Sequence, residues 1–155
     1  MATSAYEYAL NLLTARPYSE RNLRRKLARR EFPVAESDSA IVRLLAAGLI
    51  DDRRYAEQFA RSRFLGGGSS RRRLQQQLYA RGVPARIADA AIDEVIDEEA
   101  IDLQEMAMRA ARKKFASLAG LDALTVRRRL YSHLARAGYS LDMIRLAMTH
   151  ALSGD

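Results

Sequence analysis

The sequence predicts an all-α protein of three tandem three-helix repeats, each with a helix-turn-helix-like form. Apolar residues recur with helical spacing, and no stretch shows sustained alternation of apolar β-branched residues. The chain of 155 residues also has only 3 Pro and 8 Gly, which stand mainly between the helical stretches. Repeats of this kind contact chiefly their neighbours along the chain, so we expect an elongated, curved molecule.

The first repeat contains clear start and stop signals. Ser19 is a typical N-cap, and Leu23 and Leu27 follow it one turn apart, which predicts a helix with a buried Leu face. Pro33 ends this helix and introduces the next one. The acidic pair 51–52 then begins the first helix of the following repeat.

The same pattern occurs three times in register, which predicts repeats at residues 1–50, 51–97 and 98–155. Each copy has two Leu four residues apart, a three-residue turn with an apolar middle residue, and a core residue eight positions after the Pro or Ser that closes the turn. The first copy comprises Ser19, Leu23, Leu27, Glu31, Phe32, Pro33, Ile41 and Leu45. The second comprises Ser70, Leu74, Leu78, Gly82, Val83, Pro84, Ile92 and Ile96. The third comprises Leu130, Leu134, Gly138, Tyr139, Ser140, Met148 and Leu152, with Val126 at the cap position.

Two junctions depart from the plain pattern. Residues 66–70 form a Gly-Gly-Gly-Ser-Ser loop, which we expect to be mobile. Between residues 85 and 115 the chain has neither Gly nor Pro. The last helix of the second repeat therefore either continues into the third repeat or bends only slightly there.

Composition and cysteine content exclude several classes of protein. Hydrophobic residues make up 48% and charged residues 29%, as in soluble folded proteins. The absence of Cys excludes disulfides, thiolate metal sites and thiol nucleophiles. The most apolar stretch, residues 40–50, is too short to span a bilayer, and the start of the sequence does not resemble a secretory signal. We therefore expect a cytoplasmic protein with no membrane association.

The net charge of +7 is unevenly distributed. Residues 1–81 carry +8, residues 82–108 carry −7, and residues 109–155 carry +6, so two basic zones flank an acidic one. This pattern favours an acidic partner, either nucleic acid or the acidic face of another protein. The alternative is that opposite charges neutralise one another within the fold.

The residues that could carry catalysis form no recognisable arrangement. His133 and His150 are the only histidines, and they lack a metal-ligand spacing. The acidic segment 89–105 lacks the Gly and alternating oxygen donors of a calcium loop, which favours a solvated helix face. The triple-Gly loop is not followed by Lys-Ser/Thr, as a phosphate-binding loop would be. We predict that the protein is not an enzyme and uses neither a metal nor a cofactor.

The arginines are more regularly arranged. With Leu23 on the buried face, Arg21, Arg25 and Arg29 fall on the opposite face of the same helix. Guanidinium groups bind phosphate or carboxylate through a planar fork. The position two residues before the first core Leu is Arg in all three repeats. The predicted partner-binding or DNA-binding residues are Arg21, Arg25, Arg29, Arg72, Arg73, Arg128 and Arg129. The alternative is that these helices are Arg-rich only for solubility.

The second and third helices of each repeat also look like a helix-turn-helix. The third helices, however, have few side chains that read base edges, and residues 84–96 are acidic. Sequence-specific DNA recognition is therefore not expected.

Several segments resemble the RecX family. Residues 16–27 (RPYSERNLRRKL) and residues 48–56 (GLIDDRRYA) match its two more specific motifs. The turns at 82–84 and 138–140 fit the same family plan. The likeness covers nearly the whole chain and is loosest in the third repeat.

This resemblance implies regulation of RecA, the bacterial recombinase of DNA repair and homologous recombination. Members of the family look like negative modulators that associate with the RecA–DNA filament along its helical groove. They limit filament growth, ATP hydrolysis and strand exchange. The resemblance implies no catalytic residues. Asp52 and Tyr55 carry over as motif positions, and we expect structural roles for them, as a cap and a packing aromatic.

Two other functions remain open at this stage. One is a general nucleic-acid-binding module with weak, salt-dependent affinity for single- or double-stranded DNA and no preference for a filament. The other is a passive adaptor for another acidic protein. No exposed heptad pattern indicates an obligate dimer, so we expect a monomer.

Overall fold

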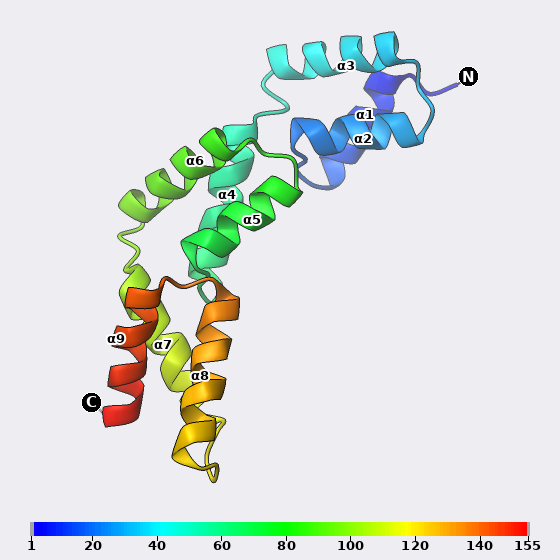
Figure 1. Ribbon diagram of the computed structural model, residues 1–155. Helices are drawn as coiled ribbons and strands as arrows, with labels where there is room; N and C mark the ends of the chain where they lie inside the picture. The colour runs from blue at the N-terminus through cyan, green and yellow to red at the C-terminus, as the bar shows by residue number, and fades with distance from the viewer. Residues whose placement is uncertain (1, 155) are drawn as a thin grey trace. The chain divides into compact units, whose positions relative to one another are not determined.

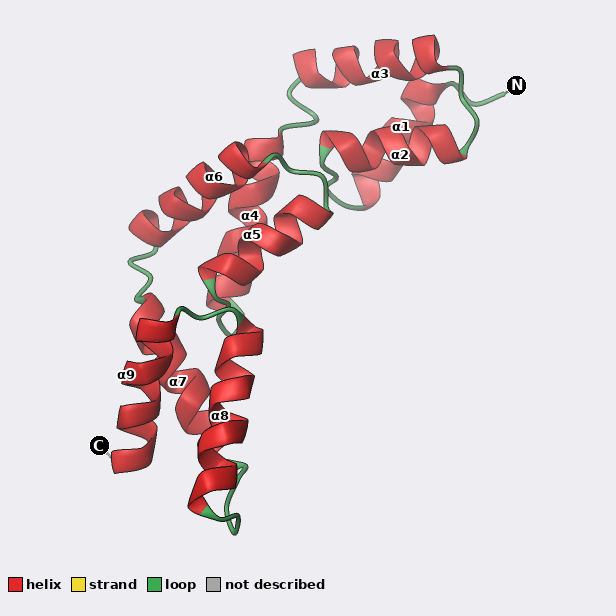
Figure 2. Cartoon of the chain, viewed as in Figure 1, coloured by secondary structure: helices red, strands yellow, loops and turns green. Residues whose placement is uncertain are grey.

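The computed structural model describes residues 2–154, and within them it contains nine α-helices and no strand (Figures 1 and 2). The all-α fold predicted from the sequence is confirmed. The helices are α1 (Ala5–Ala15), α2 (Glu20–Arg29), α3 (Val34–Ala46), α4 (Asp52–Leu65), α5 (Arg71–Ala80), α6 (Ala85–Glu98), α7 (Leu103–Ala116), α8 (Ala123–Ala137) and α9 (Leu141–Ser153).

The chain forms two compact units. The first contains the residues up to Ala60 together with Gln77–Glu94, and the second contains Arg61–Gln76 together with the residues from Val95 on. Helices α4–α6 therefore contribute residues to both units. The repeat boundaries at 50/51 and 97/98 stay predictions.

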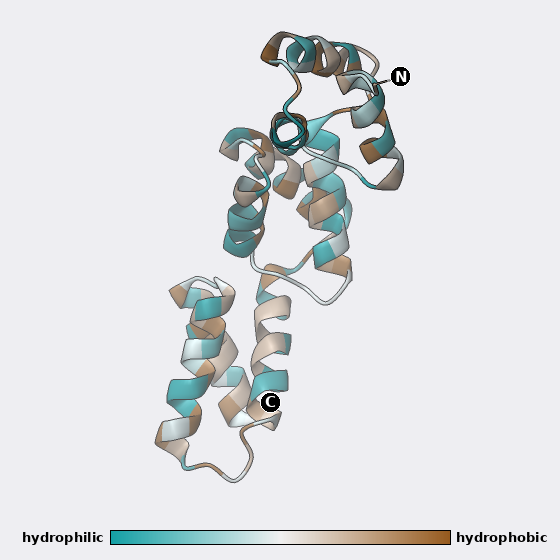
Figure 3. Ribbon diagram, turned by 90° about the vertical axis from the view of Figure 1, so that its right-hand side faces the viewer, coloured by the Kyte–Doolittle hydropathy of each residue, from teal (hydrophilic) through white to brown (hydrophobic). Residues whose placement is uncertain are grey.

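Two apolar cores hold α1–α3 and α7–α9 together. The Leu pairs of the second helix of each repeat lie at the centre and are fully buried, as predicted. The first core includes Leu23, Leu27, Ile41, Leu44 and Ile50. The second includes Ala111, Leu130, Leu134, Ile144 and Ala147. Each of helices α7–α9 carries hydrophobic and hydrophilic segments, which lets one face pack inward while others meet solvent (Figure 3).

The third helix of each repeat uses the same inward positions, with two departures from the sequence prediction. The fourth, seventh and eleventh residues after the Pro or Ser that closes the turn are buried in all three repeats. They are Ser37, Ala40 and Leu44; Ala88, Ala91 and Val95; and Ile144, Ala147 and Ala151. Leu45 is 42% exposed, because Leu44 occupies the inward position one residue earlier. Met148, predicted as a core residue, is only half-buried at the edge of its cluster.

The turn after the second helix is the same in all three repeats. Its first residue has a left-handed backbone: φ is 61° at Glu31, 85° at Gly82 and 94° at Gly138. The N–H of the apolar middle residue then bonds to the carbonyl of the second core Leu, at 3.4 Å from Phe32 to Leu27, 3.0 Å from Val83 to Leu78 and 3.3 Å from Tyr139 to Leu134. This bond closes the helix in a Schellman-type cap.

Two helix boundaries differ from the prediction. Helix α8 begins one turn before Val126, because the side chain of Asp122 accepts a hydrogen bond from the Thr125 N–H at 2.9 Å. The hydroxyl and the N–H of Thr125 both hold the pKa of Asp122 below its ordinary value. Val126 is therefore a buried residue inside the helix. The chain between α6 and α7 is also broken: Ala100 is left-handed (φ 48°), and Asp102 caps α7.

A buried serine connects the second helices of successive repeats. Ser19 caps α2 by accepting from the Asn22 N–H at 3.2 Å, and its hydroxyl donates to the carbonyl of Arg81. Ser70 does the same for α5: it accepts from the Arg73 N–H at 3.1 Å and donates to the Ala137 carbonyl at 2.6 Å. In each case the acceptor directly precedes the left-handed glycine of the following repeat. We call this arrangement the serine joint.

The serine joint also explains why the turn residue is glycine in the second and third repeats. A Cβ on Gly82 would lie 2.6 Å from the Cβ of Arg21, and a Cβ on Gly138 would lie 2.6 Å from the Oγ of Ser70. Both approaches are too close for any other residue. The turn of the first repeat has Glu31 in the same left-handed backbone conformation, with φ 61°.

Replacing Gly82 with Ala should destabilise the protein more than replacing Gly120, which has nearly the same φ (84°) but open space around its missing Cβ. Gly120→Ala carries only the left-handed backbone cost, about 1 kcal/mol. Gly82→Ala adds a clash, which we expect to bring the loss to about 3 kcal/mol. Denaturant unfolding of both variants measures the difference. Equal losses would show that the close approach to Arg21 costs nothing.

Replacing Ser70 with Ala should cost more than replacing Ser140, which caps α9 by accepting from the Met143 N–H but is exposed and makes no joint. Loss of the cap alone costs about 1 kcal/mol. At Ser70 the carbonyl of Ala137 also loses its donor, so we expect about 2 kcal/mol in total. Ser19→Ala should behave like Ser70→Ala. If Ser70→Ala lost no more stability than Ser140→Ala, the hydrogen bond to the Ala137 carbonyl would add nothing beyond an ordinary helix cap.

Candidate basic binding surfaces

The two residues of the acidic pair 51–52 accept hydrogen bonds at the starts of two different helices. Asp51 caps α4 by accepting from the Arg54 N–H at 3.1 Å. Asp52 instead reaches the start of α2, where its carboxylate accepts from the Glu20 N–H at 2.9 Å. Burial raises the pKa of Asp52; the bond from Glu20 N–H opposes this rise, and the carboxylates of Glu20 and Asp51 add to it. Asp52 therefore fastens α4 to the amino end of α2.

Tyr55 lies one turn further along α4. It is half-buried, and its ring stacks on that of Phe59 with 6.5 Å between centroids. Both motif residues thus make contacts within the first unit, one polar and one aromatic.

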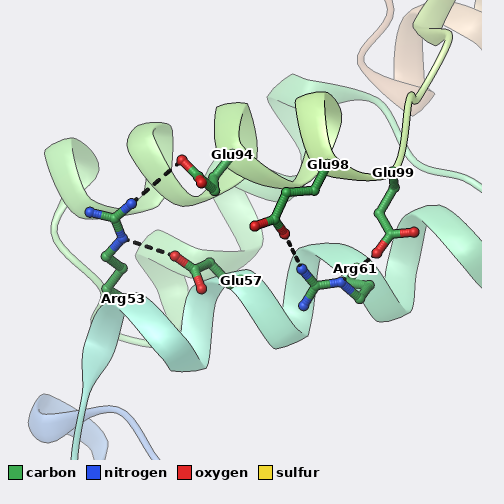
Figure 4. Close-up of polar contacts among 6 residues, drawn as sticks. All are labelled: Arg53, Glu57, Arg61, Glu94, Glu98 and Glu99. Atoms are coloured by element: carbon green, nitrogen blue, oxygen red, sulfur yellow. Dashed lines mark hydrogen bonds and ion pairs between the residues drawn. The ribbon is translucent and has the colours of Figure 1, made fainter.

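Three glutamates of the acidic zone pair with two arginines of α4 (Figure 4). In the first unit, Arg53 pairs with Glu57 at 2.9 Å and with Glu94 at 3.6 Å. In the second unit, Arg61 pairs with Glu98 at 2.6 Å and Glu99 at 2.8 Å. These pairs are exposed, so each adds little stability. These ion pairs matter for partner binding, because the charge that is free to meet a partner is then carried by basic side chains elsewhere in the chain.

The predicted stripe on α2 is exposed, but its members have different surroundings. Arg25 and Arg29 line a shallow cleft of about 170 Å³ together with Arg16 and Lys26. Arg21 lies at the serine joint, where its aliphatic stem passes over Gly82. The structure therefore brings Arg25 and Arg29 to one cleft and gives Arg21 a packing contact that the sequence did not predict.

The neighbouring arginines of α5 face two different cavities of the second unit. Arg72 lines one of about 310 Å³ with Tyr139 and Met143. Arg73 lines a larger one of about 580 Å³ with Arg109 and other residues of α7. Adjacent positions on a helix point about 100° apart, which accounts for the separation.

The predicted residues of α8, Arg128 and Arg129, are both exposed. Arg127 before them lines a separate cleft of about 500 Å³ with Arg145 of α9. The three consecutive arginines thus spread around α8 rather than forming one patch.

Sequence reasoning missed three basic residues of α7 that line the cavity of about 580 Å³ together with Arg73. They are Arg109, Lys113 and Lys114. Arg109 and Lys113 are four residues apart, so their spacing places them on one helix face. That signal was present in the sequence, but only the fold shows that this face meets the start of α5.

Within residues 2–154, no group of three or more His, Asp or Glu side chains is placed to hold a metal ion. None of the helices in that range is both long and apolar enough to cross a membrane.

Replacing Asp52 with Asn should remove a pH-dependent loss of stability. Because the pKa of Asp52 is raised in the folded state, ionising this carboxyl opposes folding. Its contribution is therefore most favourable below the ordinary carboxyl pKa, about 4, and declines as the pH rises through the higher folded value. Asn keeps an oxygen that can accept from Glu20. The denaturant midpoint of Asp52→Asn, relative to that of the wild type, should increase as the pH rises from about 3 to 6. Asp52→Ala, which lacks the acceptor, should be less stable throughout, and a difference independent of pH would contradict the assignment.

Comparison with known proteins matches the chain to three consecutive family models. They are the first, second and third three-helix domains of RecX, which match residues 5–44, 51–92 and 101–148.

Curated relatives match over almost the same range. The regulatory protein RecX of Trichlorobacter lovleyi is 37% identical over 147 residues, covering 92% of each chain. That of Chlorobium phaeobacteroides is 36% identical over 141 residues, covering 91% of this chain and 89% of the relative. The crystal structure of RecX from Lactobacillus salivarius shares the fold, with a TM-score of 0.81 over 96% of this chain and 95% of that chain, at 20% identity. With three domain models in order and relatives above 30% identity over nearly their full length, the chain belongs to the RecX family.

Proposed function

We propose that this chain is a negative regulator of RecA that binds the RecA–DNA filament and limits its growth, ATP hydrolysis and strand exchange. Its family is one of regulatory proteins rather than enzymes. Through that membership, RecA is its implied target. We further propose that it acts as a monomer in the cytoplasm, where RecA filaments form.

The observation that carries the proposal is the recurrence of an exposed arginine at one position of every repeat. Arg21, Arg72 and Arg128 each stand two residues before the first core Leu of their helix, and all three are exposed. A filament offers the same negatively charged surface once per protomer, so a repeated cation suits such a partner. The pairing of Arg53 and Arg61 with three glutamates of the acidic zone adds support, because it reduces the free negative charge that would repel DNA.

A second candidate function is general DNA binding without preference for a filament. It is favoured by the basic clefts on α2 and between α5 and α7. Binding of this kind depends steeply on salt and needs no RecA.

The decisive experiment titrates the protein into RecA already assembled on single-stranded DNA and follows ATP hydrolysis near physiological salt. We expect inhibition well below the concentration that coats the same DNA without RecA. Inhibition only at saturation of the bare strand would indicate competition for DNA and favour the second candidate. An absence of inhibition would contradict the proposed regulation of RecA.

The arginine assignment is tested by the variant Arg21→Gln/Arg72→Gln/Arg128→Gln. Gln keeps the Cβ, Cγ and Cδ atoms, so the stem of Arg21 over Gly82 is largely preserved. We expect about tenfold more protein to be needed for inhibition, equivalent to about 1.4 kcal/mol of binding. The stability of the variant should change by less than about 1 kcal/mol.

The matched control is Arg86→Gln/Arg112→Gln/Arg136→Gln, which removes the same charge from exposed positions on α6, α7 and α8. It should inhibit like the wild type. Equal weakening of both variants would mean that total charge matters and position does not. A large fall in the melting temperature of the first variant would place these arginines in the fold instead.

A further inference from the structure

The second unit contains a cleft between the amino end of α5, helix α7 and helix α8. Its volume is about 580 Å³. The end of the triple-Gly loop forms one wall, where Ser69 and Ser70 are buried and Ser70 is held by its joint to Ala137. The residues on this wall are thus anchored, although the loop was predicted to be mobile. We call this cavity the α5–α7–α8 cleft.

The α5–α7–α8 cleft is strongly cationic. Arg73 of α5 and Arg109, Lys113 and Lys114 of α7 all line it. None of the described residues lining it is Asp or Glu. Within residues 2–154, none of these four basic side chains takes part in an ion pair. Four like charges that converge without a counter-charge repel one another, so an anion bound among them would be stabilised.

The amino end of α5 adds to this positive potential. The helix has 10 residues, and its cap residue Ser70 lies in the wall of the cleft. The positive end of the helix dipole is therefore directed at the same space as the four cations.

Tyr139 gives the cleft an aromatic wall. Burial raises the pKa of its phenol, while the charges of Arg109 and Arg73 act to lower it, which shows that both arginines lie close to the ring. His133 lines the cleft from α8. Burial, Lys114 and Arg136 all lower the pKa of His133, so its imidazole is mainly neutral at physiological pH. A basic groove with an aromatic side chain is the usual design of single-strand binding sites.

We propose that the α5–α7–α8 cleft binds the phosphodiester backbone of single-stranded DNA directly, with Arg73, Arg109 and Lys113 at the phosphates and Tyr139 beside the adjoining nucleotide. This inference rests on the second candidate function above and deepens it, because it assigns DNA binding without a filament to one cleft and to a single strand. The cleft is also separate from the repeated arginines Arg21, Arg72 and Arg128, none of which lines it.

Phosphate is favoured over the carboxylate of an acidic protein for two reasons. The cations surround a concave space, whereas an acidic protein surface would meet them on an open face. Combined Arg and Lys groups at a helix amino end also suit the several oxygens of a phosphate, whereas one carboxylate offers only two.

The test measures fluorescence anisotropy of a labelled oligothymidylate of about 15 nucleotides, with the full chain and no RecA. The variant Arg109→Gln/Lys113→Gln changes two exposed side chains of α7, so it should fold normally, which circular dichroism and thermal melting check. We expect its affinity to fall about tenfold or more near 100 mM salt. The slope of log K against log salt should also fall by about 1.4, the value for two lost phosphate contacts on a single strand.

The matched control is Arg86→Gln/Arg112→Gln, which removes the same charge from exposed residues outside the cleft. It should keep the wild-type affinity and slope. Equal losses in the two variants would overturn the proposal, since binding would then follow net charge alone. Competition by polyglutamate as effective as that by unlabelled oligothymidylate of equal charge would also overturn it, because the cleft would then not favour phosphate.

A duplex of the same length separates strand types. We expect weaker dependence of duplex binding on Arg109 and Lys113 than of single-strand binding. The same loss for both would contradict a single-strand site. Because these measurements contain no RecA, they fail or succeed independently of the ATP hydrolysis experiment.

Discussion

The hydroxyl of a buried serine is the contact on which the repeat organisation depends. In each serine joint, one Oγ both caps the helix of its own repeat and donates to the carbonyl that directly precedes the turn glycine after the corresponding helix of the next repeat. One small side chain thus satisfies groups at the two ends of two helices, which would otherwise lack partners. The close approach leaves no room for a Cβ at Gly82 or Gly138. Turn, cap and contact between repeats are therefore one structural unit rather than three.

The charge pattern is organised around this framework. Arg53 and Arg61 on α4 neutralise Glu94, Glu98 and Glu99 locally, so the zone that looks acidic in the sequence presents less free negative charge. The sequence left two alternatives, neutralisation of charge within the fold and a basic surface for an acidic partner. Each holds in a different place: charges are neutralised on α4 and α6, and uncompensated basic charge lies on α2, α5, α7 and α8.

Local sequence signals predicted most of the fold, because caps, Leu spacing and turns act within a few residues. Ser19, Ser70 and the three turns are examples, and their register was correct. The prediction failed where a partner distant in sequence decides the outcome. Asp52 looked like a cap for α4 but bonds to α2, and Lys113 meets Arg73 only through packing. It also failed at Ala100, where a non-glycine residue takes the left-handed conformation that ends α6.

The two ends of the repeat series lack the joint residues. The first repeat has Glu31 where the others have glycine, and the third has buried Val126 where the others have the joining serine. A further repeat joined in the same way would meet the side chain of Glu31 at one end and would lack the serine hydroxyl at the other. Within the described residues, the serine joint is thus confined to the two junctions between the three repeats.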